Sequence, residues 1–299
     1  MRFCADTLFS ALCHTAQLHG GNARVAKLCE AAARGELLLS DGMPWREQVQ
    51  EDILYLPRPV LSPRKRIEVA PEKRKAIKKL RYIPAKAMDD YFQSIVNGIP
   101  IDFSGFSQNF GFSEERTRVA ISSEGDARPY FVGIFHFLQD CGLYFISACA
   151  DDALQDEIHR LLTLLQYGGI GGKISSGLGK FEIVDTIDLS EPFDADTKWL
   201  NQALLQVEAP IQMTLSACLP ASDELETALD GAEYQMIRRG GFISDPINYL
   251  APRKKRSQAV FQAGSTFCCR FQGQLSEVGV SAGHTIYRYN RPLWVGVSI

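Results

Sequence analysis

The chain has 299 residues, of which 45% are hydrophobic and 22% are charged, and its formal net charge is −3. This length suits two ordinary domains with packed cores. The slightly negative balance excludes any argument for nucleic-acid binding from net charge, so such a role has to rest on local basic patches. We expect neither a signal peptide nor a membrane span, because the longest apolar runs are only of strand length.

The eight cysteines are scattered, and none of them forms a CxxC pair. This distribution matches neither a zinc site nor a disulfide framework. We therefore expect reduced thiols in a cytoplasmic protein, with no metal and no cofactor.

The first half of the chain predicts a mixture of helices and strands. Asp6 can cap a helix that places Leu8, Phe9 and Leu12 on one face. Residues 105–126 are polar and contain glycine, which is typical of a protruding hairpin or a mobile loop. The other elements expected here are a helix near 30–39, a strand at 53–57, paired strands at 130–137 and 142–147, a helix over 151–166 and a strand at 181–185.

A basic segment extends from Pro63 to Arg81, where lysine and arginine far outnumber Glu68 and Glu72. Such a run is usually a solvated surface or a loose linker. Contact with phosphates is the functional alternative, and nothing within this segment decides between the two.

Residues 168–181 are the most informative part of the sequence, with six glycines, two lysines and two serines. Glycine allows backbone N–H groups to approach a ligand, and such groups beside Lys and Ser form an anion cradle that usually binds phosphate. A glycine-rich turn without a ligand is the alternative. The candidate residues are Gly168, Gly169, Gly171, Gly172, Lys173, Ser175, Ser176, Gly177, Gly179 and Lys180.

Two common phosphate-binding motifs do not fit this run. A P-loop requires glycine where Tyr167 stands and a hydroxyl where Ile174 stands. Its element order is also reversed, because the run here lies between a predicted helix and a predicted strand. The dinucleotide pattern GxGxxG fails as well, since Ile174 and Glu182 occupy the position of its third glycine.

The second half predicts another small α+β unit after a polar linker at 190–198. Ser222 can cap a helix that contains Leu225 and Leu229. Strands are expected at 211–217, 259–267 and 287–299. Cations lie beside glycines again in this half, at Arg238, Arg239, Lys254 and Lys255.

The ordered motifs resemble a known family. The glycine-rich run followed by a strand resembles the signature of the RAMP superfamily of CRISPR–Cas proteins, and the full set resembles the fourth subunit of the type III-A (Csm) effector complex. The motifs are residues 6–12 (DTLFSAL), 56–59 (LPRP), 78–84 (KKLRYIP), the glycine-rich run, 239–242 (RGGF) and 263–267 (AGSTF).

The resemblance implies an α+β fold of two ferredoxin-like (RRM-like) domains with antiparallel sheets, one over residues 1–200 and the other over 201–299. Family members normally have a strand before the first helix, so we expect the N-terminal domain to lack its first strand. The implied function is that of a non-catalytic subunit that holds the 5′ handle of the CRISPR RNA. The implied partners are this RNA, the large palm-domain subunit and a neighbouring backbone RAMP subunit, with no membrane involved.

The resemblance implies that the cationic candidates contact RNA. The glycine-rich run would hold RNA phosphates, and Tyr167 or Phe181 could stack on bases, although core packing is the better expectation for Phe181. Further candidates for RNA contact are Arg116 and Arg118 beside the expected hairpin, and Arg238, Arg239, Lys254 and Lys255 in the second domain.

Three alternatives remain open from the sequence. The first is a repeat-processing endoribonuclease of the same fold, which would need a general base such as histidine. The second is a purely structural subunit, and the third is the equivalent subunit of a type III-B complex. No motif ties any of the five histidines (His14, His19, His136, His159 and His284) to a catalytic partner.

Overall fold

The computed structural model describes residues 3–63, 77, 79–103, 105–121, 127–243, 253–281 and 283–298. Helices and strands are mixed along the chain, and every named strand pair in the described part is antiparallel, which confirms the expected combination of helices with antiparallel sheets. Most of the basic segment between Pro63 and Arg81 lies outside the described residues. No described helix has the length and apolar character needed to cross a membrane.

The chain begins with a long bent helix, α1 (Ala5–Arg34), which turns at Gly21 with a positive φ of 69°. The cap differs from the sequence expectation, because Cys4 precedes the helix and Asp6 lies in its first turn. Asp41 supplies the missing acceptor, since its Oδ1 accepts a hydrogen bond from Ala5 N at 2.9 Å. The helix expected near 30–39 was also wrong in extent, since it is the end of α1 followed by a strand.

The N-terminal half contains a four-stranded sheet in the order β4-β3-β2-β7 and a separate β1–β8 pair. The strand predicted at 53–57 is confirmed as the fully buried β3. These strands are β1 (Leu37–Leu39), β2 (Met43–Arg46), β3 (Ile53–Pro57), β4 (Tyr82–Pro84), β7 (Cys141–Tyr144) and β8 (Ser147–Cys149).

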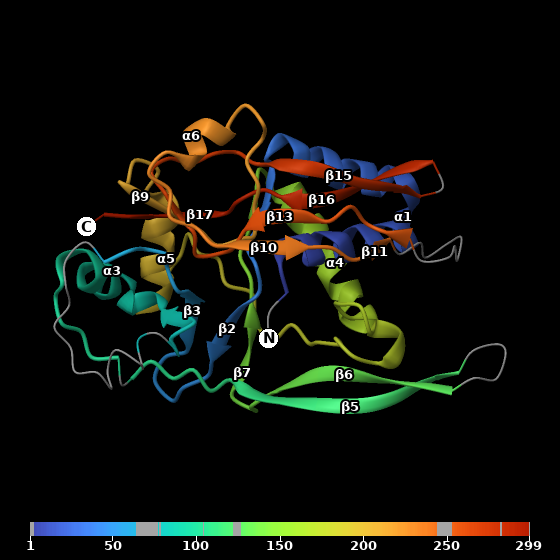
Figure 1. Cartoon of the computed structure of the whole chain (residues 1–299), viewed down its shortest axis with the longest axis horizontal. Coiled ribbons are helices and arrows are strands. Elements are labelled where there is room, and N and C mark those ends of the chain that lie inside the picture. Colours follow the sequence, from blue (N-terminus) through green and yellow to red (C-terminus); the bar gives the residue numbers. More distant parts are fainter. Residues whose placement is uncertain are drawn as a thin grey trace.

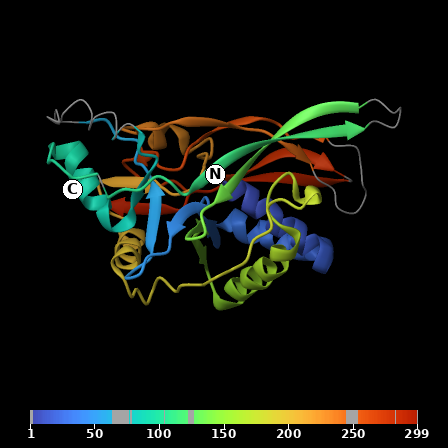
Figure 2. The same cartoon turned by 90° about the horizontal axis from the view of Figure 1, so that it is seen from below.

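Between β4 and β7, a short helical segment leads to a long hairpin. The hairpin strands β5 (Gly111–Ile121) and β6 (Ala127–Phe137) pair along their whole length, and Figures 1 and 2 show them projecting along one side of the molecule. The hairpin expectation is therefore confirmed. The predicted pairing of 130–137 with 142–147 was wrong, because β6 pairs with β5 and β7 pairs with β2. The helical segment consists of η1 (Ala85–Ala87) and α3 (Met88–Asn97).

Helix α4 (Asp152–Gly168) leads directly into the glycine-rich run. It begins where Asp151 accepts a hydrogen bond from Leu154 N at 2.8 Å, as expected for an N-cap aspartate. Its apolar stripe of Ile158, Leu161 and Leu165 packs with buried residues of α1. Burial of this stripe therefore fixes the position at which the glycine-rich run starts.

The second half is joined to the first by one continuous core. The linker expected at 190–198 was wrong in part, because Asp194 and Thr197 form a capping box that starts α5 (Ala195–Leu205). The largest apolar cluster contains residues from both sides of residue 200, including Leu56 and Val295. The two halves therefore bury apolar surface against each other.

The remaining strands form a three-stranded sheet in the order β14-β9-β17 and three two-stranded pairs. Glu224, and not Ser222, precedes the short helix α6, and its Oε2 accepts a hydrogen bond from Ala221 N at 2.9 Å. The elements are β9 (Ile211–Thr214), α6 (Leu225–Leu229), β10 (Met236–Arg239), β11 (Phe242–Ile243), β12 (Arg253–Lys254), β13 (Gln258–Phe261), β14 (Thr266–Phe267), β15 (Gln274–Ser281), β16 (His284–Asn290) and β17 (Trp294–Val297).

Candidate nucleic-acid interface

The glycine-rich run folds as a loop that is closed at its base. Ile170 N donates a hydrogen bond to Gly179 O at 2.8 Å. Gly169 and Gly179 have positive φ angles of 85° and 79°, and a Cβ at Gly179 would lie 2.1 Å from the Ile170 carbonyl oxygen. These two glycines are therefore required by the backbone of the loop itself.

The tip of the loop is open. A Cβ at Gly171, Gly172 or Gly177 would meet no atom within 4 Å. The backbone N–H groups of Gly171, Gly172 and Lys173 donate to no acceptor within the described parts of the chain. Three successive free N–H groups beside a lysine are the arrangement that binds an anion. Gly168 is equally open, and Ser175, Ser176 and Lys180 are at the surface or partly exposed.

The strand predicted at 181–185 is absent. These residues belong to no strand, and Ile183 N donates instead to the side-chain oxygen of Gln166 at 2.8 Å. The alternation of side chains was visible in the sequence, but a strand also needs a neighbouring backbone for its hydrogen bonds. No described strand lies beside this segment in the sheets.

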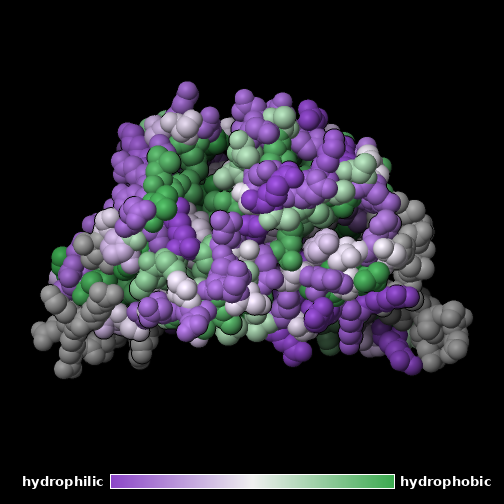
Figure 3. Space-filling model, turned by 90° about the horizontal axis from the view of Figure 1, so that it is seen from above, coloured by the Kyte–Doolittle hydropathy of each residue, from purple (hydrophilic) through white to green (hydrophobic). Residues whose placement is uncertain are grey.

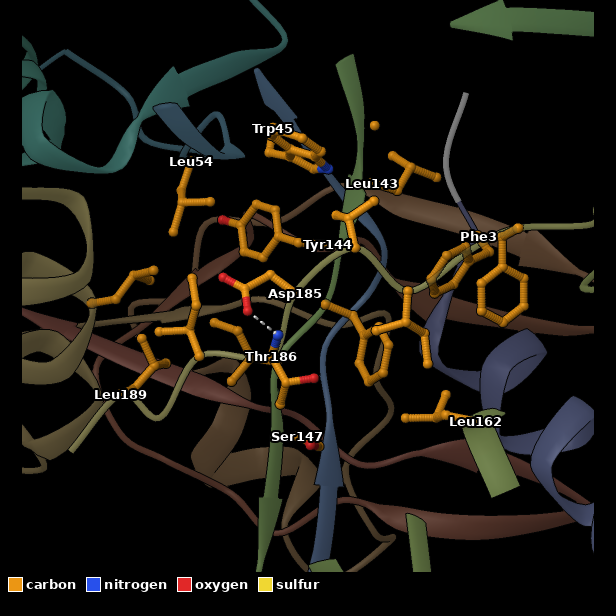
Figure 4. Close-up of a pocket in the computed structure, with 18 of the residues that line it drawn as sticks. Phe3, Trp45, Leu54, Leu143, Tyr144, Ser147, Leu162, Asp185, Thr186 and Leu189 are labelled. Atoms are coloured by element: carbon orange, nitrogen blue, oxygen red, sulfur yellow. Dashed lines mark hydrogen bonds between the residues drawn. The ribbon is translucent and has the colours of Figure 1, made fainter. Parts of the chain in front are cut away.

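An open cavity of about 1930 Å³ lies beside the loop. Gly171, Gly179 and Lys180 line it together with β7 and residues 181–189. Figure 4 shows Tyr144 and Leu143 on one side with Asp185 and Thr186 nearby, and Figure 3 shows apolar side chains gathered in a hollow of the surface. Eight carboxylates also line the cavity, and the parts of the lining that they form are unfavourable for RNA phosphates: Glu47, Glu51, Asp52, Asp156, Glu182, Asp185, Asp188 and Asp194.

The projecting hairpin meets the loop through one aromatic residue. Lys173 Nζ lies 4.9 Å from the centre of the Tyr130 ring, within cation–π range. Arg118 on β5 lies directly opposite Tyr130 on β6, so both side chains emerge on the same face of the hairpin. The structure therefore brings together two predicted residues, Lys173 and Arg118, that are far apart in the sequence.

Arg116 is exposed at the surface but already has a carboxylate partner. Its guanidinium binds Glu114 through two hydrogen bonds of 2.7 and 2.9 Å. Glu114 also contacts His136 Nε2 at 2.7 Å. The bonds from Arg116 and His136 lower the pKa of Glu114 to about 2, so this carboxylate stays ionised at any physiological pH.

The four candidates in the second half divide into two pairs. Arg238 and Lys254 are exposed on β10 and β12. Arg239 turns inward and binds Asp6 and Thr7, whereas Lys255 is partly buried. In each pair of adjacent cations, Arg238–Arg239 and Lys254–Lys255, the first residue is exposed and the second is partly buried, because successive residues of an extended chain face opposite sides.

Sequence reasoning missed Tyr130. The two aromatic candidates named from the sequence differ in exposure, since Tyr167 is 79% exposed and Phe181 packs against the α1–α4 core as expected. Tyr130 reads in the sequence as one member of an alternating strand. Only the folded hairpin brings it to Lys173, 43 positions along the chain, so no local signal could identify it.

The fold is similar to those of proteins with solved structures. The fold resembles that of a chain in the solved Csm3–Csm4 subcomplex of a type III-A CRISPR–Cas interference complex, with a TM-score of 0.65, 17% identity, and coverage of 99% of this chain and 94% of that chain. It also resembles a chain in a Csm1–Csm4 cassette with cA4, with a TM-score of 0.59, 18% identity, and coverage of 100% and 94%. These likenesses define the class of fold, a mixture of helices and antiparallel sheets.

Sequence comparison narrows the class to one family. The family model "CRISPR Csm4 C-terminal domain" matches residues 207–297. A Csm4 protein of Mycobacterium tuberculosis is 32% identical over 296 residues, covering 98% of this chain and 89% of its own length. A Csm4 protein of Streptococcus thermophilus is 27% identical over 310 residues, covering 100% and 92%. The chain therefore belongs to the Csm4 family, which confirms the resemblance seen in its motifs.

Proposed function

We propose that this protein is a non-catalytic RNA-binding subunit of a cytoplasmic type III-A (Csm) effector complex, where it holds the 5′ handle of the CRISPR RNA. The observation that carries the proposal is the open loop tip, with Lys173, two serines and three N–H groups that donate to no acceptor among the described residues. RNA single strands are gripped through phosphates, 2′-hydroxyls and stacked bases. The tip offers donors for the phosphates, and Tyr130 offers an aromatic ring beside them.

Partners are proposed from the same family relationship. The structurally similar Csm4 chains were solved with Csm3 in one case and with Csm1 in others. We extend this to the present chain as docking onto a neighbouring backbone RAMP subunit and onto the large palm-domain subunit. The two-domain division at residue 200 and the ferredoxin-like character of each domain are part of the same proposal.

The non-catalytic assignment rests on the surroundings of the histidines. A general base near the 2′-hydroxyl would be expected for metal-free RNA cleavage. His136 has a carboxylate partner, Glu114, but that carboxylate is already bound through both oxygens by Arg116. Burial lowers the pKa of His14, which lies in α1. Incubation of the purified protein with repeat RNA tests this assignment, and metal-independent cleavage lost in His136→Ala would overturn it.

The RNA grip is tested by changing only the open tip. Combining Gly172→Asp with Lys173→Ala places an anion in the cradle and removes its cation, without a steric clash at the Cβ. We expect the affinity of the assembled complex for handle RNA to fall by at least about tenfold, because each charged hydrogen bond contributes roughly 1.5–3 kcal/mol. Fluorescence anisotropy with labelled handle RNA measures the change.

Two further variants make the result interpretable. Gly172→Ala adds only a methyl group to the open tip, so it should weaken binding less than the double variant. Lys198→Ala removes an exposed lysine of α5 and should leave binding unchanged. Normal assembly and unchanged RNA retention in the folded double variant would overturn the proposed function.

A further inference from the structure

A cluster of charged side chains joins the first turn of α1 to the second half of the chain. Arg239 of β10 donates from Nη2 to Asp6 Oδ1 at 2.6 Å and from Nε to Asp6 Oδ2 at 3.2 Å. Arg288 of β16 places its Nε 3.5 Å from the same carboxylate. Lys255, just after β12, donates its backbone N–H to Gly241 O at 2.9 Å, and Arg288 donates to the carbonyls of the adjoining residues Arg256 and Gly240, so the Lys255 backbone lies beside both arginines. Figure 1 shows that β10 and β16 pass across α1, which brings these elements together.

The cluster carries more positive than negative charge. Two described carboxylates, Asp6 and the buried Asp41, act on Arg239, and with three cations in the cluster one positive charge is left in excess. The side chains are also withdrawn from water, since Arg288 is 2% exposed and Asp6 is 12% exposed. Surplus charge in a poorly hydrated position is unfavourable unless an anion compensates it.

The three cations differ in how firmly they are held. Arg288 donates to the carbonyls of Arg256 and Gly240, so it is fixed as part of the fold. Within the described residues, Lys255 has neither a hydrogen-bond nor an ion-pair partner for its ammonium group. Burial lowers the pKa of Lys255, Asp6 partly offsets this, and Arg288 and Arg239 lower the pKa further. Lys255 is therefore the cation that gains most from an added anion.

The cluster opens towards the same cavity as the glycine-rich loop. Arg239 and Thr7 line one part of the cavity, and Gly171 and Lys180 line another. Arg239 is 27% exposed, so a ligand can reach its guanidinium. A strand of RNA held at the loop therefore has an accessible second group of cations.

We propose that Lys255 and Arg239, with Arg288 behind them, bind one phosphate group of RNA at the junction between α1 and the second half of the chain. The inference rests on the proposed RNA-binding function and adds a site to it. The negative charge of Asp6 repels the phosphate, but its hydrogen bonds hold the Arg239 guanidinium in position. Because the cations and Asp6 come from different halves, the bound phosphate would also hold the two halves together.

The test compares Lys255→Met with wild type, using the chain assembled in its complex and handle RNA as the probe. We expect the affinity to fall about fivefold to tenfold, as for the loss of one charged contact. The slope of log K against log salt should flatten by roughly 0.7, the value for one phosphate of a single strand. Lys198→Met is the matched control, since it removes an exposed lysine of α5.

A second measurement separates binding from folding. If Lys255 is surplus charge, Lys255→Met should keep or raise the melting temperature of the free chain while it weakens RNA binding. A lower melting temperature in the absence of RNA would show that Lys255 has a structural role and would overturn the inference. If the loop-tip variants lose RNA but Lys255→Met binds with the wild-type affinity and salt slope, only this site fails. If the loop-tip variants also bind normally, the proposed function fails.

Discussion

At the scale of single residues, the hairpin and the loop share a small charged network. Glu114 is hydrogen-bonded to Arg116 and His136 on one face of the hairpin. On the same face Tyr130 contacts Lys173, and Arg118 lies opposite Tyr130, where a ligand can reach it. Arg116 thereby neutralises a local carboxylate, and the free cations lie closer to the loop. One predicted arginine thus has an evident structural partner, and the other is accessible for phosphate contact.

This network predicts the titration of Glu114. Arg116 and His136 lower its pKa to about 2 in the folded chain. A carboxylate whose pKa is lower folded than unfolded adds stability above its ordinary pKa, and this stability is lost as the pH falls towards the folded value. Carbon-13 titration of the side-chain carboxyl should therefore show Glu114 ionised at pH 3. Arg116→Leu should move its midpoint up towards the ordinary range, and an unchanged midpoint would contradict the role given to Arg116.

At the scale of elements, Asp41 connects the start of α1 to the second half. Its Oδ1 accepts hydrogen bonds from Ala5 N at 2.9 Å and from Ala217 N at 3.0 Å. The side chain is almost completely buried. One carboxylate oxygen thus satisfies a free N–H of the helix terminus and a backbone N–H that follows β9.

Removal of this carboxylate should loosen the junction. We expect Asp41→Ala to lower the free energy of unfolding by about 3 kcal/mol, because two buried hydrogen bonds to a charged group are lost. Asp41→Asn keeps an oxygen in the accepting position and should cost less. Urea denaturation measures both variants, with Asp223→Ala, at an exposed aspartate, as the control. Equal losses for the Ala and Asn variants would contradict the assignment of the bonds to Oδ1.

The same examples show what the sequence could predict. Periodic elements such as α4 and β3 were found because their apolar spacing is local. The cap of α1 was missed because Asp41, its actual acceptor, is 36 residues from Ala5. The partner of β6 and the contact of Tyr130 with Lys173 were missed for a related reason, since alternation identifies a strand but not its neighbour. The glycines were predicted as a group, but only the φ angles and clashes separate Gly169 and Gly179 from the open tip.

At the scale of the whole molecule, one continuous core holds both halves while an open cavity separates β7 from residues 181–187. β7 pairs with β2 along one edge, from Met43 opposite Tyr144 to Arg46 opposite Cys141. Residues 181–187 pair with no described strand. The cavity wall formed by β7 is therefore held by the backbone hydrogen bonds of a sheet, whereas the wall formed by residues 181–187 has no such ladder among the described strands.

This asymmetry predicts a pattern of amide hydrogen exchange. Amides of β7 that bond to β2 should exchange slowly, because they open only with the sheet. Amides of residues 181–187 should exchange quickly, except at Ile183, whose N–H donates to Gln166, and at Thr186, whose N–H donates to Asp185 Oδ1. Gln166→Ala should remove the protection of Ile183 and leave Thr186 and β7 unchanged. Slow exchange across the whole of 181–187 in the isolated chain would mean that this segment has backbone partners, and it would overturn the description of the cavity wall as unpaired.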